Sequence, residues 1–233
     1  LRRLARAAGG PTPRQPDPVP AMVDFARQLR ARDIELMIVP IPVKPEWTAA
    51  TLGGHATGRV TNASFDLWKQ RLEAEGVMVW DPGPLLRDGY LRSDTHWTPA
   101  GMDRVASGLA AVVKTHLAAA PEAGYERLER AMAGRGDLSA MLDVDGEMES
   151  VILQEVVRGS AGWQPDLAAE VLLLGDSFSN IFAQEGLGWG SRAGFAEQLS
   201  FYLQRPVDRL ARNDAGGFAA REMLARYLAR GRD

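Results

Sequence analysis

The feature that most constrains the fold is an alternation of helix-like and strand-like segments along most of the chain. Residues 21–33 place apolar side chains at helical spacing, and a continuous apolar run follows at 34–42. The order recurs with a helix pattern over 64–76 and a strand pattern over 77–81. Strands that alternate with helices pair mostly in parallel and are covered on both faces. We therefore expect an α/β fold, a mostly parallel sheet in a flavodoxin-like three-layer sandwich.

The second half of the chain continues this alternation. Thr98 and Pro99 have the chemistry of a helix cap and a first helical residue, which predicts a helix to about Ala119. The further patterns predict strands over 150–157, 170–175 and 206–211, and helices over about 190–204 and 217–229. The chain has 233 residues and is 45% hydrophobic, which suits one sizeable core. We expect an extended, proline-rich lead-in over residues 1–20 and a single domain over 21–233.

Composition excludes several classes of protein. The net charge is −3 with both signs scattered, so no basic surface is expected to follow a nucleic acid. The chain has no cysteine, which rules out disulfides and thiolate metal sites. No run of 18 apolar residues occurs. Because the chain begins at Leu1, we expect it to be truncated at both ends, with room for a membrane anchor in the missing N-terminal segment.

A polar corner ends the most hydrophobic strand pattern. In "EVLLLGDSFSNIF", residues 170–182, the apolar run leads directly into Gly175, Asp176 and Ser177. In α/β sheets, ligands bind beyond the carboxyl ends of the strands, so Ser177 is placed to face a cleft. Backbone N–H groups at such a corner can bind an oxyanion. We expect Gly175, Asp176 and Ser179 to support this corner, with Asp176 bonded to the backbone.

A second cluster supplies the groups that a serine nucleophile needs. In "RSDTHWTPAG", residues 92–101, Asp94 and His96 are two positions apart, so an extended chain directs both to one side. A serine hydroxyl requires a base, and the base requires a group that orients it. We therefore predict Ser177 as the nucleophile, His96 as the base and Asp94 as the orienting acid. Of the three histidines, only His96 has a suitable neighbour.

These two clusters carry a resemblance to a known family. "GDSFS" after an apolar strand resembles the nucleophile block of SGNH (GDSL-type) hydrolases, whose ordinary members place an Asp-x-x-His pair after the serine. Here Asp-x-His precedes the serine. With "SDTHWTPAG", "VPIPVKPEW" and the stretch from "GWGSRAGF" to "RNDAGG", the chain looks like the SGNH-like domain of the alginate O-acetyltransferases (AlgX/AlgJ type) over roughly residues 33–230. The chain departs from that family at Asp176, where Thr is common.

The resemblance implies an activity. Ser177 would carry an acetyl group, His96 would act as base, and a hydroxyl of an exopolysaccharide or cell-surface glycan would accept the acetyl group. The family implies no cofactor, a periplasmic or other extracytoplasmic location, and a membrane-bound O-acyltransferase partner that supplies the acetyl donor. Lys44, Trp47, Trp97 and Trp189 are candidates for substrate binding; for each tryptophan, a place in the core or at its rim is an equally good interpretation.

Three alternatives remain open at this stage. A carbohydrate acetylesterase would use the same triad with water as the acceptor. A metal-dependent phosphoesterase would use Asp94 and His96 as ligands, but three histidines are few for such a site, so no metal is expected. A glycan-binding protein with an inactive triad is the third possibility.

Overall fold

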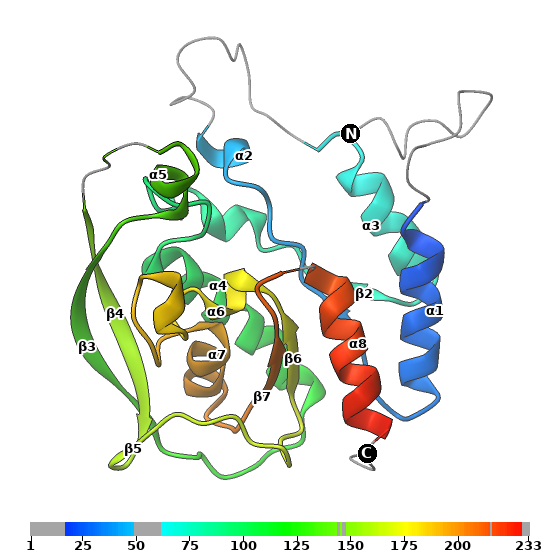
Figure 1. Cartoon of the computed structure of the whole chain (residues 1–233). Coiled ribbons are helices and arrows are strands. Elements are labelled where there is room, and N and C mark those ends of the chain that lie inside the picture. The colour runs from blue at the N-terminus through cyan, green and yellow to red at the C-terminus, as the bar shows by residue number, and fades with distance from the viewer. Residues whose placement is uncertain (1–16, 49–61, 144, 146–147, 215, 230–233) are drawn as a thin grey trace. The chain divides into compact units, whose positions relative to one another are not determined.

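The computed structural model describes residues 17–48, 62–143, 145, 148–214 and 216–229 (Figure 1). The chain divides into two compact units, residues 1–83 and 84–233, each with its own strands and buried apolar residues. The predicted lead-in lies largely outside the described residues, and the predicted single domain stays a prediction. No helix in the described part of the chain is long and apolar enough to cross a bilayer.

The first unit pairs two short parallel strands and packs helices beside them. Its elements are α1 (Val19–Arg30), β1 (Met37–Ile38), α2 (Pro45–Thr48), α3 (Phe65–Ala74) and β2 (Met78–Val79). Strand β1 lies parallel to β2, with Met37 opposite Met78. The apolar faces of α1 and α3 meet the strands around buried Ala26, Leu72 and Val79. Helices α1 and α3 were predicted from the apolar spacing, and the parallel pairing from the alternation of helices and strands.

The second unit holds most of the secondary structure and both predicted motifs. A short 3-10 helix, Gly83–Leu86, spans the boundary between the units. The elements that follow are α4 (Pro99–Val113), a 3-10 helix (Lys114–His116), β3 (Tyr125–Gly134), α5 (Asp137–Met141), β4 (Glu149–Arg158), β5 (Ala161–Gly162), β6 (Leu172–Gly175), α6 (Ser177–Asn180), a 3-10 helix (Glu185–Leu187), α7 (Phe195–Leu203), β7 (Asp208–Ala211) and α8 (Gly216–Ala229).

A long antiparallel ribbon corrects the prediction of a mostly parallel sheet. Strands β3 and β4 have ten residues each and pair from Tyr125 opposite Arg158 to Gly134 opposite Glu149 (Figure 1). Strand β6 pairs in parallel with β7, as predicted, so the sheets of this unit are mixed. The pattern over 150–157 predicted β4, but β3 was missed because its sequence, "YERLERAMAG", is rich in charged residues.

The core of the second unit lies between helices and strands that flank the two motifs. Helices α4 and α7 pack against each other, and α8 packs on β6 and β7 (Figure 1). Thr98 caps α4 as predicted, because its hydroxyl accepts a hydrogen bond from Gly101 N at 3.0 Å. The loop that carries Asp94 and His96 therefore leads directly into α4, and the serine corner follows β6.

Candidate active site

The serine corner is a sharp turn between β6 and the four-residue helix α6. The Asp176 side-chain carboxylate accepts a hydrogen bond from Phe178 N at 2.9 Å. The backbone carbonyl oxygen of Asp176 accepts one from Ser179 N at 3.0 Å. A Cβ atom at Gly175 would overlap the Ser179 hydroxyl, so this close approach requires glycine. The sequence predicted the bond from Asp176 to the backbone; it did not specify the contact between Gly175 and Ser179. An oxyanion-binding role for the corner stays a prediction.

Three side chains form one continuous hydrogen-bonded chain. Ser177 Oγ lies 2.8 Å from His96 Nε2, and His96 Nδ1 lies 2.6 Å from Asp94 Oδ1. Since a carboxylate only accepts, Nδ1 carries the proton and Nε2 is the nitrogen that accepts from the serine hydroxyl. The Asp94 and His96 side chains are only 2% and 9% exposed, whereas Ser177 is half-buried. The structure thus brings together the three predicted residues, Ser177, His96 and Asp94.

The loop between Asp94 and His96 is tightly folded. Asp94 Oδ1 also accepts a hydrogen bond from the backbone N–H of His96 at 3.0 Å, a local turn that directs both side chains to one side. The backbone N–H of Leu91 donates to the His96 carbonyl at 3.0 Å, and Thr98 N donates to the Gly89 carbonyl at 2.7 Å. The sequence predicted the common orientation from an extended chain, but the structure has a tight turn here, and the turn's hydrogen bonds direct both side chains to one side.

The second oxygen of Asp94 has partners that come from elsewhere in the fold. Asp94 Oδ2 accepts hydrogen bonds from Trp189 Nε1 at 2.8 Å and from Asp137 N at 3.2 Å. Burial by itself raises the pKa of the Asp94 carboxyl, but the hydrogen bonds from His96 and Trp189 outweigh burial and hold that pKa well below its usual range. Asp94 is therefore an anion in position to stabilise a protonated imidazole ring.

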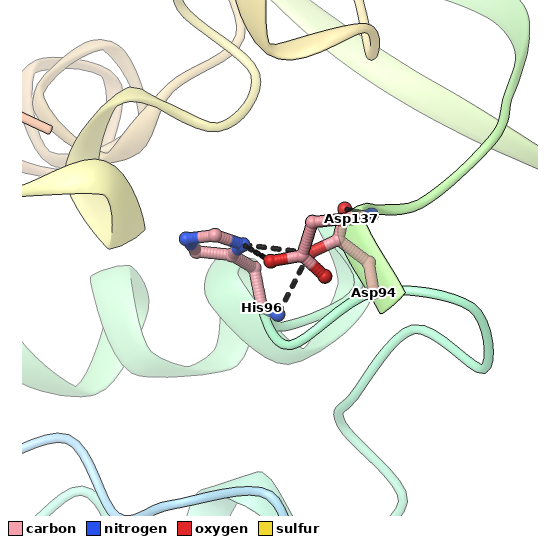
Figure 2. A group of neighbouring side chains, drawn as sticks. All are labelled: Asp94, His96 and Asp137. Atoms are coloured by element: carbon pink, nitrogen blue, oxygen red, sulfur yellow. Dashed lines mark hydrogen bonds and ion pairs between the residues drawn. The ribbon is translucent and has the colours of Figure 1, made fainter. Parts of the chain in front are cut away.

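Asp137 is a site residue that the sequence reasoning missed. It lies on the Nδ1 side of His96, at the start of α5, with one carboxylate oxygen 3.8 Å from Nδ1 (Figure 2). That carboxylate accepts hydrogen bonds from Thr95 N at 2.7 Å and from Thr95 Oγ1 at 2.5 Å. No motif marked Asp137, because it is more than forty positions from its partner in a segment without clear periodicity.

Neighbours of Asp137 hold the same loop from the end of the β3–β4 ribbon. Glu149 accepts hydrogen bonds from Ser93 N at 3.0 Å and Ser93 Oγ at 2.9 Å, and Leu138 N donates to the Ser93 carbonyl at 3.1 Å. A Cβ atom at Gly136 would overlap the Ser93 backbone, so the two segments are in close contact. We refer to the four residues Gly136, Asp137, Leu138 and Glu149 as the brace.

The Asp94, His96 and Asp137 ligand atoms lie within 4.8 Å of one another, a spacing that a metal ion could use (Figure 2). The hydrogen bonds argue against this use. Both oxygens of Asp94 and both oxygens of Asp137 already accept hydrogen bonds, and Nδ1 of His96 points its proton at Asp94. A cation there would have to compete with these N–H and O–H donors and with the proton on Nδ1. The set instead suits an imidazole ring that gains a proton.

Two predicted substrate contacts are wrong. Trp189 is fully buried, and its indole N–H donates to Asp94. Trp97 is 1% exposed and packs against Phe178 and Phe195, with ring-centre distances of 5.4 and 5.2 Å. Neither indole offers a face to a sugar, because each is enclosed by the core. Lys44 and Trp47 are half-buried and belong to the first unit, so their predicted contact with substrate stays a prediction.

Comparison with known proteins gives the family. The model of the family described as "SGNH hydrolase-like domain, acetyltransferase AlgX" matches residues 8–232. The chain belongs to this family. It is similar to a "probable alginate O-acetylase AlgJ" of Pseudomonas fluorescens, with 28% identity over 180 residues, which is 68% of this chain and 46% of that protein. A second protein of the same description, from Pseudomonas aeruginosa, is 28% identical over 51% of this chain and 32% of its own length.

Solved structures agree on the fold. The O-acetyltransferase domain of Pseudomonas putida AlgJ superposes with a TM-score of 0.70 at 18% identity, over 88% of this chain and 73% of that one. Pseudomonas aeruginosa AlgX superposes with a TM-score of 0.58 at 19% identity, over 84% of this chain and 49% of that one. The SGNH-hydrolase-like architecture is therefore shown, while the chain spans about half the length of the curated relatives that it matches.

Proposed function

We propose that this chain is a serine-dependent O-acetyltransferase that moves an acetyl group through an acetyl-Ser177 intermediate onto an exopolysaccharide or cell-surface glycan. The observation that carries the proposal is the continuous chain from Ser177 Oγ through His96 to Asp94, with links of 2.8 and 2.6 Å. Family membership and relatives described as probable alginate O-acetylases support acetyl transfer as the reaction.

In the first half-reaction, His96 Nε2 takes the proton of Ser177 as Oγ attacks the carbonyl carbon of the acetyl donor. The donor's leaving group departs with that proton, and Ser177 is left as an acetyl ester. While His96 holds the proton, the ring is a cation hydrogen-bonded to the ionised Asp94. The low pKa of Asp94 keeps the carboxylate available as the counter-charge at any physiological pH.

In the second half-reaction, a sugar hydroxyl replaces the donor. His96 accepts the hydroxyl proton while the sugar oxygen attacks the acetyl-Ser177 carbonyl, and Ser177 then recovers the proton as it leaves. The acetylated glycan and the free enzyme are the products. With water as the acceptor, the same steps release acetate, which is the carbohydrate acetylesterase alternative. Transfer requires the acceptor to be positioned so that it reacts faster than water.

The proposal includes a location and a partner. Acetylation of an exported glycan places the enzyme outside the cytoplasm, where acetyl donors must be supplied across a membrane; a membrane-bound O-acyltransferase suits that role. Among the residues of the first unit, Lys44 and Trp47 remain our candidates for contacts with the glycan. Lysine is suited to an acidic sugar, and the indole ring is suited to stacking on a sugar face.

The test is an acceptor competition. The protein is incubated with an activated acetyl ester and unacetylated oligosaccharides, both acidic and neutral, and the products are analysed by mass spectrometry. We expect an oligosaccharide that has gained one acetyl group, and none with Ser177→Ala. If every glycan leaves free acetate as the only product, the esterase alternative replaces the transferase.

A further inference from the structure

A second carboxylate faces the catalytic histidine from the side opposite the serine. In Figure 2, Nε2 of His96 points away from both acids, while Nδ1 faces Asp94 and Asp137. Asp94 is the orienting acid of the proposed triad, and Asp137 has no role in it. We propose that Asp137 is a positioning residue that fixes the loop of His96 and, by its negative charge, strengthens His96 as a base. This inference rests on the proposed function.

Asp137 is hydrogen-bonded to the two residues that precede His96 in the loop, Asp94 and Thr95. Its backbone N–H donates to Asp94 Oδ2 at 3.2 Å, and its carboxylate accepts two hydrogen bonds from Thr95, at 2.7 and 2.5 Å. The preceding residue, Gly136, packs so closely on Ser93 that no side chain fits there. Asp137 therefore cannot shift along the loop without breaking contacts on two sides, and the loop cannot shift without moving Asp137.

The charge of Asp137 acts where the reaction places a positive charge. His96 becomes a cation when it takes the proton of Ser177, and one Asp137 oxygen lies 3.8 Å from Nδ1. With the ring neutral, the two carboxylates repel each other; with the ring protonated, a cation lies beside both. Asp137 therefore favours the protonated ring, and a stronger base removes the serine proton more readily. The Asp137 side chain is 29% exposed, so solvent weakens this effect without removing it.

Among the described residues, Asp94 and Asp137 are the charged groups that lie against the His96 ring. Asp94 comes from the same loop and Asp137 from α5. The remaining neighbours are uncharged: the hydroxyls of Thr95 and Ser177, and the Phe178 ring of α6 at a ring distance of 4.7 Å. A change in charge at Asp137 should therefore be visible in the protonation behaviour of the base.

Glu149 provides a matched control. Like Asp137, it is a carboxylate of the brace that accepts backbone and hydroxyl hydrogen bonds from the loop, at Ser93. Unlike Asp137, it bonds to Arg92 and Ser93 and not to His96 or its immediate neighbours. Glu149→Gln should therefore disturb the position of the loop without removing a charge next to the ring. Asp137→Asn keeps the shape and one acceptor oxygen, and Asp137→Glu keeps the charge.

The experiment measures how fast a fluorophosphonate probe labels Ser177 from about pH 5 to 9, followed by mass spectrometry. For Asp137→Asn we expect the acid-side midpoint of the rate profile to fall by about 0.5–1 pH unit. The plateau rate should drop by about tenfold. For Glu149→Gln we expect a lower rate with an unchanged midpoint, and for Asp137→Glu a midpoint returned toward that of the wild type.

An Asp137→Asn midpoint equal to that of the wild type would overturn the inference, since only a structural role would remain. If wild-type Ser177 is not labelled at any pH, the proposed function itself fails, which is a distinguishable result. Circular dichroism checks that each variant folds. If Asp137→Asn does not fold, Asp137→Ser removes the charge and keeps the backbone hydrogen bond to Asp94. A fall in its acid-side midpoint then supports the inference, and an unchanged midpoint overturns it.

Discussion

The two segments that form the site are held in different ways. The serine corner is held mostly by local contacts: Asp176 bonds the backbone of residues two to four positions later, and Gly175 makes room for Ser179. The loop of Asp94 and His96 has local bonds as well, but its other partners, Asp137, Glu149 and Trp189, lie 42 to 95 positions away in the chain. Ser177 depends mostly on its own neighbours, although distant hydrogen bonds also reach the corner, from Arg212 N to the Gly175 carbonyl at 3.2 Å and from Asn180 to Asn213 at 2.9 Å. The Asp94 and His96 side chains depend more on distant segments of the second unit.

This difference has a consequence for how the site tolerates change. A local turn forms wherever its few residues are present, so its contribution can be altered without affecting distant parts. A loop held by distant partners is aligned only when the ribbon β3–β4 and the segment around Trp189 are in place. Changes in those partners should therefore lower the rate of the chemistry even though they touch neither substrate nor serine.

Removal of the hydroxyl of Ser177, the proposed nucleophile, should have the largest effect on activity. Ser177→Ala should lower acetyl-ester hydrolysis by roughly 10³-fold or more and leave the fold intact, because His96 and Asp94 keep their contacts with each other. The measurement is kcat/KM on a small activated ester, with Ser160→Ala, an exposed serine in the turn after β4, as the control. Activity of Ser177→Ala within threefold of the wild type would remove this residue from the mechanism.

Removal of one distant partner should have the next largest effect. Trp189→Phe keeps most of the bulk but deletes the N–H that bonds Asp94 Oδ2, so we expect kcat to fall by about 10–100-fold. The free energy of unfolding should fall by about 1.5–3 kcal/mol, since the lost hydrogen bond is made to a buried anion.

Trp163→Phe is the matched control for that variant. Trp163 is also buried and also donates from Nε1, at 2.8 Å, but to the neutral hydroxyl of Ser200. Trp163→Phe should lower the free energy of unfolding by about 1 kcal/mol and change kcat little. Equal losses of kcat in Trp163→Phe and Trp189→Phe would contradict the view that Trp189 acts through Asp94.

A local change at the corner should have a smaller effect. Asp176→Ala removes the side-chain cap of Phe178 N and should cost about 1 kcal/mol of stability. Asp176→Thr replaces one capping side chain by another and should recover most of that loss. Urea unfolding of the three proteins gives the comparison. A loss for Asp176→Thr as large as that for Asp176→Ala would show that Asp176 does more than cap the corner.

The smallest effect should be a loss of stability at acid pH that depends on Glu149. Burial raises the pKa of the Glu149 carboxyl, but hydrogen bonds from Arg92 N, Ser93 N and the Ser93 hydroxyl outweigh it and lower that pKa. A lowered pKa in the folded state means that the stabilisation is complete above the ordinary carboxyl pKa and is lost as the pH falls. Between about pH 5 and 3, the wild type should lose about 0.5–1 kcal/mol more stability than Glu149→Gln. If the free energies of unfolding of the two proteins fall equally with pH, the lowered pKa of Glu149 is contradicted.

The sequence predicts what is encoded locally. The apolar run before Gly175 marked β6 and the serine corner, Thr98 with Pro99 marked the start of α4, and the two-residue spacing of Asp94 and His96 marked a common face. Each signal lies within a few residues of the feature that it indicates. The rule that ligands bind at the carboxyl ends of parallel strands led us to expect Ser177 near His96, but its premise was wrong, because β2 and β6 belong to separate sheets.

What the sequence could not predict depends on distant contacts. A tryptophan between glycines looks the same whether its indole stacks on a sugar or donates to a buried carboxylate, and Trp189 does the latter. Strand β3 carries charged residues on its exposed positions, so the ribbon that brings Asp137 and Glu149 to the loop left no clear alternation. Because the ribbon was not predicted, nothing in the sequence indicated that Asp137 and Glu149 bond to Thr95 and Ser93.

The most direct test of the central claim is the detection of an acetyl group on Ser177. The protein is mixed with an activated acetyl ester without acceptor, quenched in acid and digested, and the peptide that contains Ser177 is weighed. We predict a gain of one acetyl group on that residue, absent in Ser177→Ala and lost when an oligosaccharide acceptor is added before the quench. Acetylated glycan that forms while Ser177 never carries an acetyl group would contradict the account.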